Sequence, residues 1–185
     1  MSYTVPTEYK ITTPYLLDAK IKEIQLAMET LSWIEYSFGR AYKGIDEGKT
    51  YPEIFQASGS DYHSCMPNDY YNFSFVWAKQ PQKLISAHKG IYHYTANLSI
   101  VVFYDRTTIG TTLTYNYDEL LKYDCMQVLD GVYGCEVTDV YDEIEDVYSL
   151  WTKPVEAQYI ARHFGALRFD ITVDYANKCE LTNTY

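Results

Sequence analysis

The chain has 185 residues, of which 47% are hydrophobic, and its 15 basic and 25 acidic residues give a formal net charge of -10. This length fits one domain with a sizeable core, so we expect a single domain over residues 1–185. The negative charge argues against a surface that grips the nucleic-acid backbone through counterion release.

The first predicted element is a helix after Thr13 and Pro14, which match an N-cap followed by proline in the first turn. Its apolar residues recur at helical spacing, namely Leu17, Ile21, Ile24, Met28 and Leu31. After Trp33 the pattern changes, because Ile34, Tyr36 and Phe38 alternate with polar residues. This alternation predicts extended chain.

Residues 43–53, KGIDEGKTYPE, contain the Gly-Lys-Thr sequence with which a phosphate-binding loop ends. Such a loop needs four residues between its two glycines, whereas only three residues separate Gly44 from Gly48. Tyr51 precedes Pro52 and is pushed towards extended geometry where the helix of such a loop would begin. We therefore predict a plain turn between two extended segments rather than a nucleotide site.

The middle of the chain predicts a loop followed by strands. Residues 52–72 are rich in Ser, Asn, Asp, Pro and Gly, which is typical of a loop, and Phe73, Phe75 and Trp77 then alternate as in a strand. Residues 80–93 show no regular pattern, whereas the apolar run over 96–104 predicts a central, buried strand.

The last third predicts two helices and a strand. Asn116 and Glu119 form a capping box for a helix that ends near Gly131 or Gly134. A further helix is predicted up to Pro154, with the apolar stripe Val137, Val140, Tyr141, Ile144, Val147, Tyr148 and Trp151. Residues 167–175 alternate as a half-buried strand, which we expect in the same sheet as the strand around Ile100.

These elements predict an α+β fold, with a mainly antiparallel sheet flanked by an N-terminal helix and two further helices. We expect a long loop or hairpin insertion in addition, and the amphipathic helices should cover the apolar face of the sheet. The start of the chain lacks the regions of a signal peptide, and no apolar run is long enough to span a bilayer. We therefore expect a soluble protein made in a cytosol.

Residues that could carry chemistry are present, but their spacing matches no known site. Cys65, Cys125, Cys135 and Cys179 form no Cys-x-x-Cys pair, so free thiols are expected. His63 and Cys65 lie near Asp61 and Asp69, with His88 and His93 further on, and this spacing matches no zinc site. The acidic run over 136–146 lacks the alternation and glycine of a calcium loop. We predict no catalytic, cofactor-binding or metal-ligating residue and no cofactor.

The 21 tyrosines instead indicate an interaction protein, because Tyr is favoured where proteins meet proteins. Four segments carry a family resemblance: FGRAYKG at 38–44, TYPEIFQ at 50–56, DYHSCMPNDYYNFSFVWAKQPQ at 61–82 and HFGALRFDITVDY at 163–175. With the order of elements, they resemble ring-forming proteins at the head–tail junction of tailed bacteriophages, including tail terminators. The resemblance is greatest to those of crAss-like phages and related elements of Bacteroidetes.

The resemblance implies a non-enzymatic structural protein of the virion, made in the host bacterial cytoplasm, that closes into a homo-oligomeric ring. Its partners would be further copies of itself, neighbouring portal, connector or tail proteins, and DNA that passes through the channel without specific binding, with no membrane. From its own composition, polar with glycines and aromatic residues at intervals, we expect segment 44–72 to contact neighbouring subunits. From its charge, we expect the acidic stretch 136–146 to face either the channel or the outer solvent. The alternatives are a small adaptor or ligand-binding module without a virion role, and an enzyme.

Overall fold

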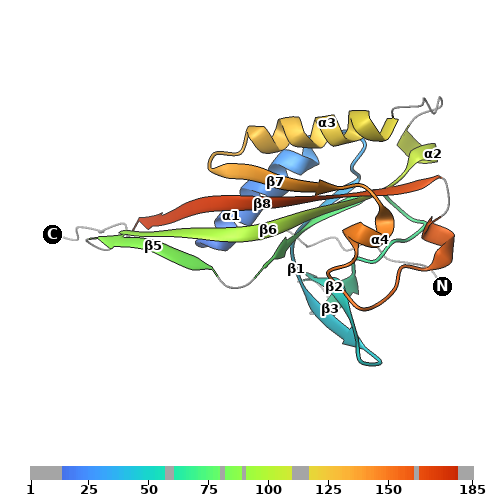
Figure 1. Ribbon diagram of the computed structural model, residues 1–185, viewed down its shortest axis with the longest axis horizontal. Helices are drawn as coiled ribbons and strands as arrows, with labels where there is room; N and C mark the ends of the chain where they lie inside the picture. Colours follow the sequence, from blue (N-terminus) through green and yellow to red (C-terminus); the bar gives the residue numbers. More distant parts are fainter. Residues whose placement is uncertain are drawn as a thin grey trace.

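The computed structural model describes residues 14–56, 61–79, 82–88, 91–109, 117–160 and 163–178. In chain order the elements are α1 (Leu17–Glu29), β1 (Tyr36–Asp46), β2 (Lys49–Gln56), β3 (Asp61–Ser64), β4 (Phe73–Ala78), β5 (Lys83–His88), β6 (Ile91–Asp105), α2 (Arg106–Ile109), α3 (Tyr117–Asp130), β7 (Cys135–Tyr141), α4 (Ile144–Val147), a short 3-10 helix (Ala157–Ile160) and β8 (Phe164–Lys178). Figure 1 shows the strands as one long twisted sheet, with α1 and α3 packed beside it.

The sheet has the strand order β3-β2-β1-β4-β6-β8-β7, and β5 pairs with the first part of β6. The β1–β4 pair is parallel, and all the other pairs are antiparallel. The predicted α+β class with a mainly antiparallel sheet is therefore confirmed. The two longest strands, β6 and β8, pair along their whole length, and Ile100 lies opposite Phe169. This register confirms the prediction that 167–175 and the strand around Ile100 share a sheet.

Two apolar clusters lie on the two faces of this sheet, because alternate residues of each central strand point in opposite directions. One cluster packs the sheet against α1 and α3, and it includes Ile21, Ile24, Leu98, Ile100, Leu121, Leu129 and Phe169. The other packs the sheet against α4 and the turns that follow it, and it includes Phe73, Phe75, Val101, Phe103, Val147, Trp151 and Phe164. The central strands are thus buried on both faces, which fixes their register.

The sequence GIDEGKT forms a tight β-hairpin, as the sequence predicts for a turn between extended segments. Asp46 pairs with Lys49, and the two residues between them, Glu47 and Gly48, both have positive φ, at 48° and 78°. Positive φ at both central positions defines the turn type whose twist matches that of the two strands it connects. Nothing in this segment adopts a phosphate-binding loop.

Gly48→Ala should destabilise the protein by about 1 kcal/mol, because an L side chain is strained at positive φ. An added Cβ at this position meets no atom within 4 Å, so backbone strain alone would cause the loss. Glu47→Gly is the matched variant, and it should leave the free energy of unfolding unchanged or raise it. Urea unfolding curves of the three proteins test this, and equal stability of Gly48→Ala and wild type would contradict the assignment of the turn.

The helix predicted up to Pro154 is the main error of the sequence-based prediction. Residues 135–141 instead form strand β7, and only Ile144–Val147 is helical before a series of turns. The apolar residues of the segment EVTDVY are compatible with the period of a helix or of a strand, and its Val and Thr residues are good strand formers. The edge of β8 offers a hydrogen-bonded partner along this segment, and that tertiary pairing decides between strand and helix.

Three further predictions are corrected. Residues 52–72 are not one loop, because they contain the end of β2 and all of β3, and residues 83–88 and 91–93 belong to β5 and β6. Pro14 lies outside the first turn of α1, which begins at Leu17. Leu16, directly before the helix, has a positive φ of 52° and is therefore not helical. The predicted residues Thr13, Asn116 and Cys179 lie outside the described residues.

The strand over 167–175 is also more buried than its alternation predicts. Residues 164–171 are all buried, although Arg168 and Asp170 are charged. The polar positions Arg168 and Asp170 therefore belong to a buried polar cluster on the face that carries α4. The predicted half-buried character holds further along the strand, where Thr172 is half-buried and Asp174 is exposed.

Candidate interaction surfaces

The residues that could have formed a metal or nucleophile site do not come together. Cys65 is buried, and burial raises the pKa of its thiol well above the ordinary value, so the thiol stays protonated and unreactive. His63 lies on β3, whereas His88 and His93 lie on β5 and the start of β6, and Figure 1 shows β3 well apart from the projecting β5. Within the described ranges, no three His, Cys, Asp or Glu residues are grouped in a way that could hold a metal ion.

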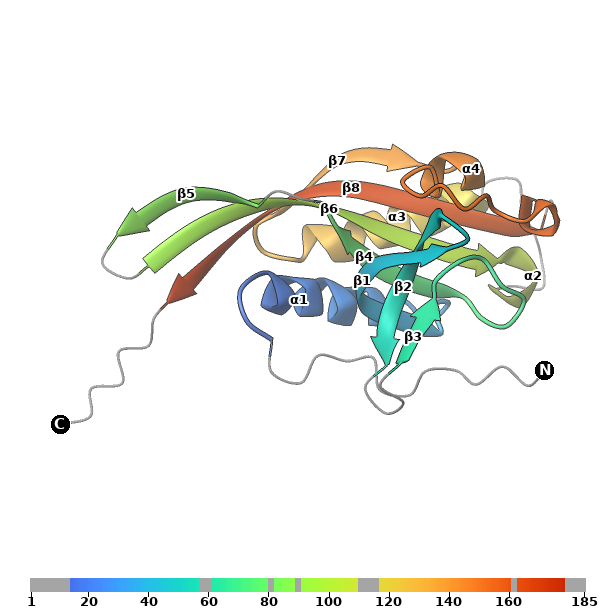
Figure 2. The same ribbon diagram turned by 90° about the horizontal axis from the view of Figure 1, so that it is seen from below.

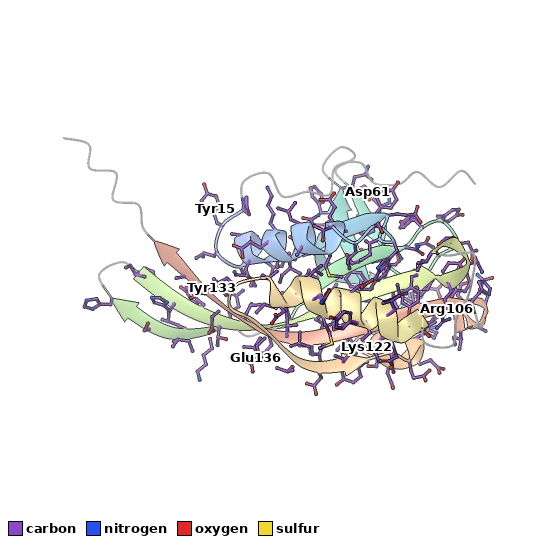
Figure 3. All side chains as sticks on the ribbon, turned by 90° about the horizontal axis from the view of Figure 1, so that it is seen from above. Tyr15, Asp61, Arg106, Lys122, Tyr133 and Glu136 are labelled. Carbon is purple, nitrogen blue, oxygen red and sulfur yellow. The ribbon has the colours of Figure 1, made fainter. Side chains whose placement is uncertain are left out.

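The acidic run over 136–146 spreads across β7, the residues after it and the start of α4. It carries six acidic residues and no Lys or Arg. Lys122 on α3 donates to Asp142 at 2.8 Å and to Glu119 at 2.7 Å, which links α3 to this segment. Glu136 and Asp139 are exposed, and Figure 3 shows Glu136 at the margin of the sheet on the side away from α1. The run is therefore an exposed acidic edge rather than a helix face.

A buried polar cluster on the α4 face of the sheet joins β6, β8 and Lys79, the residue after β4. Asp170 accepts hydrogen bonds from Lys79 Nζ and Ser99 Oγ, each at 2.6 Å, and its Oδ1 lies 3.4 Å from Arg168 Nε. Arg168 is only 4% exposed and Asp170 only 9%. Because Arg168 and Asp170 lose most of their contact with solvent, each of these two ions depends on the other for stabilisation.

The Arg168 guanidinium also donates hydrogen bonds to the segment that contains α4. Its Nη1 donates to the carbonyl oxygens of Asp146, at 2.7 Å, and Val147, at 3.2 Å, and to Ser149 Oγ at 3.2 Å. The guanidinium carbon also lies 3.7 Å from the centroid of the Tyr141 ring. One arginine thus joins β8, the end of β7 and α4.

A second charged cluster fixes the start of α3. Arg106 donates to both carboxylate oxygens of Asp118, Nε to Oδ1 and Nη2 to Oδ2, each at 2.8 Å, and the Tyr104 hydroxyl donates to Oδ1 at 2.8 Å. Figure 3 shows Arg106 beside the N-terminal end of α3. Burial acts to raise the pKa of Asp118, but the hydrogen bonds from Arg106 and Tyr104 outweigh it and hold the pKa below the ordinary value.

Asp118→Asn should remove this stabilisation at neutral pH and have no effect in acid. Because the pKa is lower in the folded protein, the stabilisation is complete above the ordinary carboxyl pKa of about 4 and is lost as the pH falls through the folded-state value. The side chain of Asp118 is 43% exposed, so we expect a loss of about 1 kcal/mol or less at pH 7. Urea unfolding at several pH values measures this, and a difference that is independent of pH would contradict it.

Large apolar side chains are exposed on three separate parts of the molecule. Leu84, Ile85, Ile91 and Tyr92 lie on β5 and the start of β6; Leu26, Leu120, Tyr123, Met126 and Tyr133 lie on or beside α1 and α3; Tyr42, Ile45, Phe55 and Tyr62 lie on β1, β2 and β3. We call these three surfaces the blade surface, the helix surface and the hairpin surface. Seven tyrosines are among the exposed apolar residues of the described chain.

The helix surface and the hairpin surface each have a defined shape. A groove of about 480 Å³ lies between α1 and the end of α3, and it is lined by Leu26, Ala27, Val128, Val132 and Tyr133. Tyr133 is 91% exposed beside this groove (Figure 3). On the hairpin surface, the Tyr62 ring lies 5.2 Å from that of Phe55 and 6.1 Å from that of Tyr42. Exposed aromatic clusters of this kind are typical of protein interfaces.

Two comparisons with known proteins identify no relative of this chain. No model of a known protein family matches the chain, and a search of curated proteins finds no significant similarity. None of the helices in the described part of the chain has both the length and the apolar character that a membrane crossing requires.

Proposed function

We propose that this chain is a non-enzymatic structural protein of a tailed-phage virion, and that it forms an oligomeric ring at the head–tail junction around the DNA channel. The observation that carries the proposal is the presence of three exposed apolar surfaces on separate parts of one subunit. A closed ring needs two different, matching faces on each subunit, and a stacked ring needs a third face for its neighbour.

Two further features support a ring in this position. The resemblance of four segments to head–tail ring proteins agrees with the α+β architecture. The net charge of -10 suits a conduit for DNA, because a wall without clustered cations does not bind phosphates as the duplex slides past. Neighbouring portal, connector or tail proteins would then cover the surfaces that the ring itself leaves exposed.

The mass of the purified protein in solution tests this proposal. Light scattering over a range of concentrations should give one high, discrete mass that corresponds to a closed ring. A monomer or dimer at every concentration would instead favour the alternative, a small soluble interaction or adaptor module. A metal ion or nucleotide that co-purifies in stoichiometric amount would favour an enzyme.

A further inference from the structure

The blade is the part of the sheet that extends beyond the helices. It consists of β5 with residues 91–95 of β6, and Figures 1 and 2 show it projecting, with the end of β8, past both α1 and α3. Every residue of β5 is exposed. Tyr94 stacks on Tyr175 at a centroid distance of 5.4 Å, which braces the blade against β8. An extended ribbon with exposed apolar residues is a site for contact with another chain.

The blade differs in charge from the rest of this acidic chain. Residues 79–95 contain three lysines, two histidines and no acidic residue. Of these, Lys83 and His88 are exposed on β5, and His93 is exposed on β6. Lys79 at the base is already paired with Asp170, and Asp174 of β8 lies beside the blade. Among the described residues no ion pair involves Lys83, so the charge of this exposed lysine, at the start of β5, is available to a partner.

The acidic edge lies at the other side of the same sheet. In the described sheet, β7 is the terminal strand and pairs with β8, whereas β5 pairs with β6 on the opposite side of the β6–β8 pair. Glu136 and Asp139 are exposed on β7, and Val140 is exposed between them and α4. Each subunit thus carries one sheet edge with an exposed lysine and no acidic residue and, on the other side of the sheet, an acidic edge.

We propose that the blade of one copy lies along the β7 edge of the next copy, with Lys83 and His88 facing Glu136 and Asp139. This inference rests on the proposed ring and specifies one of its two faces. The contact is head-to-tail, because the blade and β7 are different surfaces, so it propagates from copy to copy and closes if the rotation allows. The complementary charges would select this pairing, since two copies of the same edge repel each other.

Reciprocal charge reversal tests the pairing. The blade variant carries Lys83→Glu and His88→Glu, and the edge variant carries Glu136→Lys and Asp139→Lys. Each variant alone brings like charges together, so we expect the concentration needed for half-maximal assembly to rise at least about tenfold. A mixture of the two variants should assemble again, because the acidic blade of one variant then meets the basic β7 edge of the other. The variant with all four changes should assemble by itself.

A control variant with Asp130→Lys and Glu156→Lys makes the same charge change as the edge variant on exposed residues outside both edges, and it should assemble like wild type. All variants change exposed side chains, so their free energies of unfolding should stay within about 0.5 kcal/mol of wild type. Unfolding curves verify this before assembly is compared.

The outcomes separate this inference from the proposed function. A wild-type protein that stays monomeric at every concentration contradicts both. A wild-type ring that tolerates each reversal contradicts the blade contact alone. If the edge variant assembles normally but its rings retain DNA at low salt, then residues 136–146 face the channel. Loss of binding to a neighbouring virion protein, with assembly unchanged, would assign the blade to that neighbour.

Discussion

Phe169→Asp is expected to abolish the folded state. Phe169 is fully buried at the centre of β8, opposite Ile100, in the cluster that joins the sheet to α1 and α3. Loss of a buried Phe side chain costs about 3 to 5 kcal/mol, and burial of an unpaired carboxylate adds a further penalty. The sum approaches the whole stability of a typical domain, which is about 5 to 15 kcal/mol.

Circular dichroism and thermal unfolding measure this result. Ala176→Asp is the matched control, because Ala176 is an exposed residue of the same strand. It should fold normally, with a change within about 0.5 kcal/mol. A soluble Phe169→Asp protein with a native spectrum and cooperative unfolding would show that β8 is peripheral to the core.

Asp170→Ala is expected to be the next most destabilising change, with a loss of about 3 kcal/mol or more, because it leaves a buried cation without its partner. Arg168 would keep its contacts with the α4 turn but would lose its nearest counter-charge, and Ser99 and Lys79 would lose the acceptor they share. Urea unfolding at neutral pH measures the loss of free energy.

Two variants separate the role of charge from that of hydrogen bonding. Asp170→Asn keeps an acceptor for Ser99 and Lys79 but removes the charge, so its loss should be smaller than that of Asp170→Ala. Arg168→Met combined with Asp170→Leu removes both ions, and replacement of a buried pair by apolar residues is often neutral, so the double variant should recover part of the stability. Equal stability of Asp170→Ala and wild type would mean that water solvates this cluster.

The sequence correctly predicted those elements that show a clear pattern within their own segment. The stripe from Leu17 to Leu31 defined α1, the apolar run before Asp105 defined β6, and the Gly48 turn was recognised because its glycine spacing excludes a phosphate loop. Each of these signals lies within one segment. The fold class followed from their order, since strands with amphipathic helices beside them bury their apolar faces in only a few ways.

The elements that were missed form by pairing with another strand rather than through a regular pattern of their own. β7 forms because it pairs with β8, and β5 forms because it pairs with the start of β6, its neighbour in the sequence. The buried pair Arg168 and Asp170 was missed for a related reason. Charged residues at alternate strand positions look the same in a sequence whether they face solvent or a cluster completed by Lys79 and Ser99.

The sequence located one of the three exposed apolar surfaces, because Ile45, Phe55 and Tyr62 of the hairpin surface lie within the segment 44–72 that was expected to contact neighbouring subunits. For the helix surface and the blade surface, the abundance of Tyr indicated a protein that contacts other proteins but did not indicate where those contacts lie. The strands of the blade were not predicted from the sequence, because residues 80–93 show neither a helical nor a strand period. Its charge was visible, since 79–95 is basic within an acidic chain, and that contrast could have identified the segment as a surface of its own.

Electron microscopy of the assembled phage head–tail junction tests the central claim most directly. A map of that junction should contain this chain as a closed ring around the channel, with the blade of each copy along β7 of the next. A junction map in which every ring is accounted for by other chains would contradict the proposed function.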